Sequence, residues 1–266
     1  RGYTFTEYPD VLLTVQGGIG TAEEDQFLRS YYDVASTGWC TSVLLVPEAT
    51  TVDERTLELL KEATEKDIVL SNNSPLGVRF QYLKGTTSDT EKQSRIDSGK
   101  FGSPCTEKHL ALNTEFTDEP ICTASRKYQK LKLHQLQTLE LPEHEYEKQK
   151  ADVLAKECLC VGLSNSAALT YDEPFLKHLT AVTICPGPNI ANFSEIVSLQ
   201  TMVDHIYGRT NIMTNNQRLH VFIAEMNLYI TYVKEQINRE QIPVQDTKRK
   251  MYFQTFLRNL SEAIVY

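Results

Sequence analysis

Short apolar runs and amphipathic segments alternate along the first 75 residues of the chain. Residues 11–15 form an apolar run, which predicts a β-strand. Thr21 is followed three residues later by Glu24, which predicts a capping box at the start of a helix, and apolar residues recur at helical spacing from there to Val34. A second β run is predicted next, with residues 38–42 in or near it and the apolar residues 43–46 after it. Strands that alternate with helices in this way are typical of parallel α/β architecture.

The alternation continues through a second helix and a third strand. Thr51 and Glu54 have the spacing of another capping box, and Leu57 and Leu60 continue an apolar helix face beyond them. Residues 67–70 then predict a short strand that ends in a turn rich in Ser, Asn and Pro.

The middle of the chain has a different character. Residues 84–102 are polar and predict exposed helix and loop, and residues 128–150 are rich in Lys, Gln and Glu. Residues 158–163 predict a buried strand or short core segment, and residues 183–189 a β-like run that ends in a turn. We interpret this part of the chain as an appended region or large excursion.

Three amphipathic helices are expected near the C-terminus. Ser194 is placed to cap a helix that ends at Gly208, and two longer helices are predicted over residues 216–240 and 246–264, separated near Pro243. Their apolar stripes could face the core or a partner, and a core role is favoured. These stripes contain Leu219, Phe222, Ile223, Met226, Ile230, Val233, Phe256, Leu257, Leu260 and Ile264.

A cluster of glycines follows the first predicted strand, in the sequence Gln-Gly-Gly-Ile-Gly-Thr of residues 16–21. Glycines at a strand-to-helix turn let backbone N–H groups approach an anion, and the start of the next helix adds a partial positive charge. The turn is therefore a candidate phosphate site. An ordinary tight turn between strand and helix would also favour glycine, so both interpretations stay open on these residues alone.

Residues 8–86 resemble the C-terminal part of FMN-dependent (βα)8-barrel oxidoreductases. The families indicated are nitronate monooxygenases and the enoyl reductases of polyketide and polyunsaturated fatty-acid synthases. The resemblance rests on residues 16–21, Gly38, Glu48, 59–63, 67–69 and 77–86. It implies an α/β fold in which residues 1–86 are the last strands and helices of a TIM barrel. Residues 87–266 would be a mostly helical addition of unknown role.

The resemblance also implies a site for the FMN phosphate, which this superfamily holds in the loops after strands seven and eight. The first loop here would supply backbone amides, and the second would begin at Gly38. Trp39 stands where relatives carry a Thr or Ser, so the hydroxyl would have to come from Thr41 or Ser42. The implied cofactor-binding residues are Gly17, Gly18, Ile19, Gly38, Trp39 and Thr41.

Only two of the eight barrel strands would lie in this chain. The chain starts with Arg1 rather than Met, and we expect it to be part of a longer polypeptide or to receive the other strands from a partner chain. The resemblance therefore assigns no catalytic residue. The expected partners are a small-molecule substrate, the rest of the barrel and a second copy in a homo-oligomer.

Composition narrows the range of functions. The 266 residues carry a formal net charge of −8, which argues against general nucleic-acid binding because that needs clustered Lys and Arg. A run of about 18 apolar residues, as a membrane span needs, is absent from the sequence. With no signal peptide visible either, we expect a cytoplasmic protein with no membrane partner.

Six cysteines are scattered along the chain, and reduced, inert thiols are the favoured interpretation. Cys158 and Cys160 are separated by one residue, and on a strand their thiols would point to opposite faces. Metal-binding sequences more often show C-x₂-C spacing, so no metal site is predicted.

Several other polar residues are candidates for catalysis or ligand binding. Cys105 and His109 would share one face if their segment were helical, although a chance neighbour is favoured. His205 could contact a ligand or lie on a helix surface, and Asn165 and Asn189 could line a pocket or stabilise turns.

These patterns favour an FMN-dependent oxidoreductase of which this chain supplies the phosphate-binding loop. Two alternatives remain from the sequence. One is a non-redox binding or assembly module in which the glycine turn only packs. The other is a non-flavin TIM-barrel enzyme that binds a phosphorylated substrate at the same loop.

Overall fold

The computed structural model describes residues 10–215, 217–240 and 247–265. The chain forms two compact units, Arg1–Asn215 and Asn216–Tyr266. Residues on both sides of position 86 pack within the first unit. Its largest core cluster joins Leu45, Leu60 and Ile68 to Ile184 and Phe193. The predicted domain boundary at residue 86 therefore does not coincide with the division after Asn215, and it stays a prediction.

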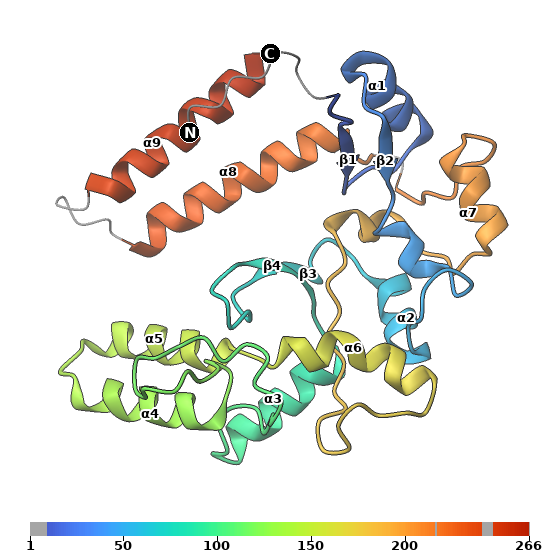
Figure 1. Cartoon of the computed structure of the whole chain (residues 1–266). Helices are drawn as coiled ribbons and strands as arrows, with labels where there is room; N and C mark the ends of the chain where they lie inside the picture. Colours follow the sequence, from blue (N-terminus) through green and yellow to red (C-terminus); the bar gives the residue numbers. More distant parts are fainter. Residues whose placement is uncertain (1–9, 216, 241–246, 266) are drawn as a thin grey trace. The chain divides into compact units, whose positions relative to one another are not determined.

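The first strand–helix–strand unit forms as the pattern predicts (Figure 1). Strand β1 (Thr14–Gln16) pairs in parallel with β2 (Ser36–Gly38), and helix α1 (Ala22–Tyr32) connects them. Thr21 is the N-cap of α1, and its hydroxyl accepts a hydrogen bond from the Glu24 N–H at 3.2 Å. This half of the predicted capping box is confirmed, since it satisfies one of the first N–H groups of the helix.

The predicted second strand forms at Gly38, in β2, but does not continue into residues 43–46. Residues Ser42–Leu45 form a 3-10 helix, η1, and Leu45 and Val46 are fully buried. A short apolar run has no periodicity that separates strand from helix. Helix α2 (Glu54–Glu62) follows, and its N-cap is Asp53 rather than Thr51, with the Thr56 N–H donating to the Asp53 carboxylate at 3.0 Å.

The third strand belongs to a separate antiparallel hairpin. Strand β3 (Ile68–Ser71) forms where expected, but it pairs with β4 (Phe80–Leu83) and not with β1 or β2. Gly77, at φ +74°, lies in the turn that reverses the chain. The parallel pattern thus ends after β2 within residues 10–215, and the barrel architecture stays a prediction.

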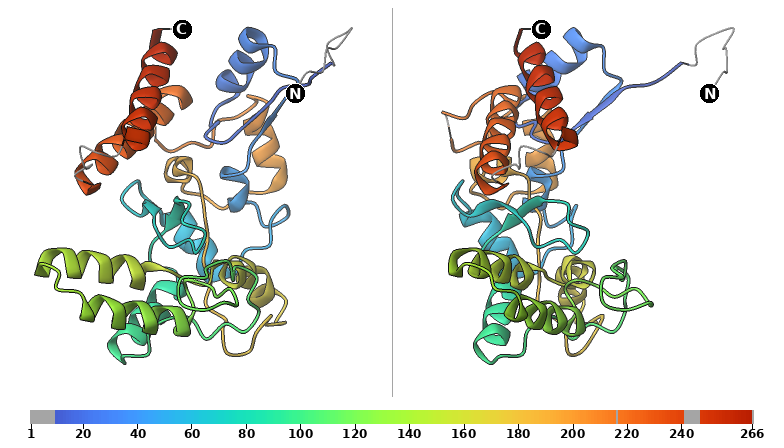
Figure 2. Two further views of the ribbon diagram at one scale, coloured as in Figure 1. Left: turned by 60° about the vertical axis from the view of Figure 1, so that its left-hand side comes forward. Right: turned by 90° about the vertical axis from the view of Figure 1, so that its left-hand side faces the viewer.

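Helices dominate the rest of the first unit (Figures 1 and 2). Helices α4 and α5 lie side by side in every view and share a small apolar cluster that includes Leu133, Leu136 and Val153. The helical elements are α3 (Thr87–Asp97), α4 (Arg126–Thr138), α5 (Glu143–Ala155), α6 (Leu159–Thr170), the 3-10 helix η2 (Pro188–Asn192) and α7 (Leu199–Ile206).

Three sequence predictions in this region are wrong in detail. Residues 158–163 begin helix α6 and are not a strand, and residues 183–189 form no strand. Helix α7 is capped by Ser198, four residues after Ser194, and the Thr201 N–H donates to the Ser198 hydroxyl at 3.1 Å. Gly208 follows the helix at φ +71°, which fits the predicted C-terminal stop.

The second unit contains helices α8 (Val221–Glu240) and α9 (Thr247–Val265). Aromatic contacts join them, including Tyr229 to Phe256 with ring centroids 6.1 Å apart. Val233 and Phe253 are buried, whereas Phe222 and Leu257 are exposed. The predicted core role therefore fails for much of the apolar stripe, because two helices alone can bury only the seam between them. None of the helices that the structure describes has the length and apolar composition needed to cross a membrane.

Candidate functional site

The two glycine-containing loops follow the C-terminal ends of β1 and β2, which lie side by side. The parallel register matches Gln16 with Gly38, so Gly17 and Trp39 are the next residues of neighbouring strands. A Cβ on Gly38 would come within 2.8 Å of the Gln16 side chain, which explains why glycine is needed there. Sequence reasoning placed both loops in one site, and the strand pairing brings them together.

Gly17 and Gly18 have φ values of +90° and +71°, which favour glycine. A Cβ on Gly17 would meet no atom within 4 Å, so the backbone of Gly17 faces open space. Ile19 instead is buried and packs with Leu28 and Val34 under the turn. Of the three predicted phosphate contacts in this loop, the first two are accessible and the third anchors the turn.

Two buried side chains from far along the chain fix the carbonyl groups of this turn. Asn189 Nδ2 donates to the Ile19 carbonyl at 3.1 Å, and His205 Nε2 bonds the Gly20 carbonyl at 2.9 Å. The sequence singled out both residues but gave no reason to link them with the glycine turn. The third candidate of that group, Asn165, lies elsewhere and donates to the carbonyls of Leu179 and Ala181.

The start of α1 is acidic. The Gly20 N–H donates to Glu24 Oε2 at 2.9 Å, and Glu23 and Asp25 lie in the same first turn. The carboxylate of Glu24 therefore already uses the positive end of the helix. An anion bound by this turn would contact residues 17–19 rather than the helix start.

The loop after β2 carries buried polar atoms that lack a partner. Trp39 Nε1 and Ser42 Oγ are both buried and have no hydrogen-bond partner in the part of the chain that the structure describes. Unsatisfied buried donors are rare, because each one costs the free energy of its lost hydration. Thr41 is also buried, and its hydroxyl lies 2.6 Å from where a Cβ on Gly187 would stand. Ser42 Oγ is therefore a hydroxyl without a partner among the described residues that is also closed to solvent, and the predicted role of Thr41 stays a prediction.

His205 supports this loop but is not poised for acid–base chemistry. Its ring packs edge-on against Trp39 and Phe193, with ring centroids 5.7 and 5.6 Å apart. Burial lowers the pKa of His205 below its ordinary value of 6.5. Its Nδ1 accepts from the Ile212 N–H at 3.5 Å, which with the Nε2 bond assigns the neutral Nε2–H tautomer.

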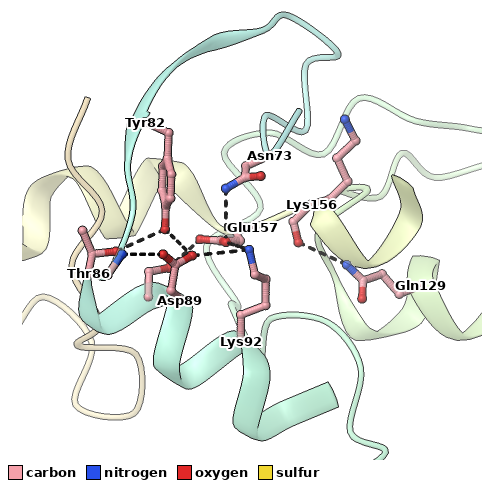
Figure 3. A network of polar contacts seen from close by, with 10 residues as sticks. Asn73, Tyr82, Thr86, Asp89, Lys92, Gln129, Lys156 and Glu157 are labelled. Atoms are coloured by element: carbon pink, nitrogen blue, oxygen red, sulfur yellow. Dashed lines mark hydrogen bonds and ion pairs between the residues drawn. The ribbon is translucent and has the colours of Figure 1, made fainter. Parts of the chain in front are cut away.

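A second polar cluster, the Glu157 network, lies where α3 meets the segment between α5 and α6 (Figure 3). Glu157 is 2% exposed, and its carboxylate accepts from Lys92, from Ser88 at 2.5 Å and from Asn73 at 3.3 Å. Both carboxylate oxygens therefore have partners, and a charge buried in this way joins three segments of the first unit.

The network extends to Tyr82 and Asp89 (Figure 3). The Tyr82 hydroxyl donates to Asp89 Oδ1 at 2.7 Å, and the Gly85 N–H donates to Asp89 Oδ2 at 2.8 Å. Burial raises the pKa of Tyr82 above its usual range, and the nearby charges of Glu157 and Asp89 raise it further. With its polar groups already bonded to one another, this cluster is suited to holding the fold rather than to binding a ligand.

The cysteines are arranged differently from the sequence expectation. Cys158 is the N-cap of α6 and Cys160 lies in the first turn of that helix, so their thiols do not alternate as on a strand. The two Sγ atoms are 3.7 Å apart, and Cys105 joins them. Residues 104–110 are not helical and His109 is exposed, so the predicted Cys105–His109 helix face does not form.

Comparisons with known proteins find a distant structural likeness. Neither a family model nor a curated protein matches the sequence. The chain is similar to the solved enoyl reductase domain of MlnA, from the macrolactin biosynthesis cluster of Bacillus amyloliquefaciens, with 19% identity and a TM-score of 0.32. The match covers 85% of this chain and 49% of that chain, so this chain spans about half of its neighbour. At this TM-score the relationship is distant only.

Proposed function

We propose that this chain supplies the phosphate-binding loops of an FMN-dependent oxidoreductase of the nitronate monooxygenase or enoyl reductase type. The observation that carries the proposal is the parallel pairing of β1 and β2. It places the accessible turn at Gly17 and Gly18 beside a loop in which Trp39 Nε1 and Ser42 Oγ are buried without a partner. Two adjacent loops at the carboxyl ends of parallel strands are where barrel enzymes bind phosphates.

The residues present fit a phosphate ester. Backbone amides at Gly17 and Gly18 and the indole N–H of Trp39 are donors, and the Ser42 hydroxyl replaces the hydroxyl that relatives carry at the position of Trp39. Asn189 and His205 bond the carbonyl groups of Ile19 and Gly20, so the turn has its shape before a ligand binds. When bound, FMN would supply the hydride or oxygen chemistry, and this chain would bind and orient it.

The β1–β2 pair also supports an additional set of strands as a partner. Within residues 10–215 no further strand pairs with either of its edges. Val11, Leu12 and Leu13, which lead into β1, are exposed, and Leu12 is 73% exposed. Parallel sheets are normally buried on both faces, and open apolar edges invite pairing. We propose that the remaining barrel strands, from the same polypeptide or a separate chain, cover this edge.

The visible absorption spectrum of the intact purified protein tests the proposal. We expect bound flavin, released on denaturation and identified as FMN. A colourless protein that also fails to bind added FMN would exclude the flavin enzyme. If that protein instead binds a phosphorylated ligand at this loop, the non-flavin barrel enzyme is the correct function.

Two glycine variants locate the cofactor site. Gly17 and Gly77 both have positive φ, +90° and +74°, and a Cβ on either would meet no atom within 4 Å. Gly17→Leu and Gly77→Leu should therefore destabilise the fold by a similar amount, about 1–2 kcal/mol of backbone strain. Only Gly17→Leu should abolish FMN retention. Equal retention in both variants would place the phosphate elsewhere.

A further inference from the structure

Three of the six cysteines gather at the start of helix α6. The Sγ atoms of Cys105, Cys158 and Cys160 all lie within 4.8 Å of one another, and all three residues are half-buried. Cys105 is more than fifty positions away in sequence from the other two. Burial raises the pKa of Cys158, and its bonds and proximity to Cys105 and Cys160 raise it further. The three thiols come from two segments that are distant in sequence and meet at one point.

Specific backbone contacts fix the segment that carries Cys105. Gly102 has φ +82°, and a Cβ there would come within 2.7 Å of the Arg126 N atom, so only glycine lets these two segments touch. The Ser103 N–H then donates to the Ala124 carbonyl at 2.8 Å, and the Arg126 N–H to the Ser103 carbonyl at 3.3 Å. These bonds tie the segment with Cys105 to the turn just before α4.

The same contacts bring a fourth cysteine near. Cys122 lies in that turn, where its carbonyl accepts from the Ser125 N–H at 2.9 Å. The Cys122 thiol is not among the three that lie within 4.8 Å of one another, so it would reach them only after a local shift of its turn. The remaining two cysteines, Cys40 and Cys185, are exposed.

We propose that Cys105, Cys158 and Cys160 bind a Zn²⁺ ion and that Cys122 becomes the fourth ligand of this structural site after a shift of its turn. Zinc in such sites is tetrahedral with Zn–S bonds of about 2.3 Å, which places its sulfur ligands about 3.8 Å apart. The Sγ atoms of Cys158 and Cys160 already stand at 3.7 Å. Soft thiolate ligands select zinc over Mg²⁺ or Ca²⁺.

The start of α6 stabilises thiolates once a metal binds, whereas burial raises the pKa of Cys158 when no metal is bound. Cys158 is the N-cap of α6 and Cys160 lies in its first turn, where the helix dipole stabilises negative charge. Cys158 directly follows Glu157, which is fixed by Lys92, Ser88 and Asn73 (Figure 3). A ligand held by such a network keeps its position while the metal binds. On binding, each thiol releases its proton to solvent as its sulfur bonds the zinc, with no change of oxidation state.

A metal would also explain how the segment between α3 and α4 is held. Residues 98–125 contain two isolated bridges but no helix or strand. Loops longer than about 12–15 residues without secondary structure are uncommon in compact domains. From this segment, Phe101 packs against the small apolar cluster that includes Leu133, Leu136 and Val153. A zinc ion that joins Cys105 and Cys122 to α6 would fix both parts of the loop, as structural zinc does in small cores.

Metal analysis of the intact protein, purified under reducing conditions without chelator, tests this site. We expect stoichiometric zinc by elemental mass spectrometry. Replacement by Co²⁺ should give the near-ultraviolet and visible bands of tetrahedral cobalt thiolate. Cys158→Ser and Cys160→Ser should lower the metal content to background, whereas Cys40→Ser and Cys185→Ser should leave it unchanged.

The titration of the wild-type protein with Co²⁺ keeps the test valid if a cysteine variant fails to fold. A wild-type protein that holds no zinc and gives no cobalt–thiolate absorption overturns the proposal. So does full zinc retention in Cys158→Ser, or a disulfide between any two of the four cysteines in the freshly isolated protein. Because the zinc site shares no residue with the glycine loops, these outcomes are independent of FMN binding.

Discussion

The two buried polar clusters of the first unit differ in one respect that indicates their roles. In the Glu157 network, both carboxylate oxygens of Glu157 accept hydrogen bonds from neighbouring side chains. In the loop after β2, Trp39 Nε1 and Ser42 Oγ are equally hidden from water but have no partner among the described residues. A satisfied network stabilises the fold that contains it, whereas unsatisfied donors lower stability unless a ligand bonds them.

Buried polar atoms without a partner also occur outside the loop after β2. Thr183 Oγ1 is a further buried atom without a partner, and it lies against Gly162 in helix α6 and not near the glycine loops. What distinguishes Trp39 and Ser42 is that both belong to one short loop beside an accessible glycine turn. Substitutions in the Glu157 network should therefore lower stability, whereas substitutions at Trp39 or Ser42 should mainly lower ligand affinity.

The largest expected effect is loss of stability on removing the Glu157 carboxylate. Glu157→Ala removes the buried acceptor of Lys92, Ser88 and Asn73 and leaves Lys92 with Asp89 at 3.6 Å, and we expect the unfolding free energy to fall by about 3 kcal/mol. Urea denaturation of the two proteins measures the difference. Glu58→Ala is the matched control, because Glu58 pairs with Lys61 on the surface, where ion pairs contribute little. Similar losses in both variants would remove the distinction between a structural network and surface charge.

A smaller effect should appear as a pH dependence from His205. Because burial lowers its folded pKa below 6.5, the unfolded chain binds more protons between these two values. Stability is then complete above pH 6.5 and declines as pH falls toward the lowered pKa. Denaturation midpoints measured across this window should decline less steeply for His205→Gln than for the wild type. An identical slope would show that other groups carry the pH dependence.

The smallest effect on stability is expected at Trp39, although ligand binding should suffer there. Trp39→Phe removes a buried donor without a partner but also part of the ring packing against His205, so unfolding free energy should change by less than about 1 kcal/mol. FMN affinity, measured by fluorescence titration, should fall. A stability loss as large as that of Glu157→Ala would mean that Trp39 is structural, and unchanged FMN affinity would remove it from the site.

The sequence by itself determined the local features of this protein. Thr21 caps α1 because its hydroxyl reaches an N–H group three residues away, and Gly17 and Gly18 occupy positive φ that other residues avoid. Such signals depend on neighbours within one turn of the chain, so they are readable without a structure. The short apolar runs at residues 43–46 and 158–163 are too short for their periodicity to distinguish helix from strand, so the sequence predicts their secondary structure wrongly.

Only the tertiary structure decided which distant residues meet. His205 reaches the Gly20 carbonyl across 185 positions, and Asn189 reaches that of Ile19 across 170. Cys105 meets Cys158 and Cys160 across more than fifty positions of the chain. Contacts of this kind depend on how the whole unit packs, so they cannot be predicted from the spacing of residues along the chain.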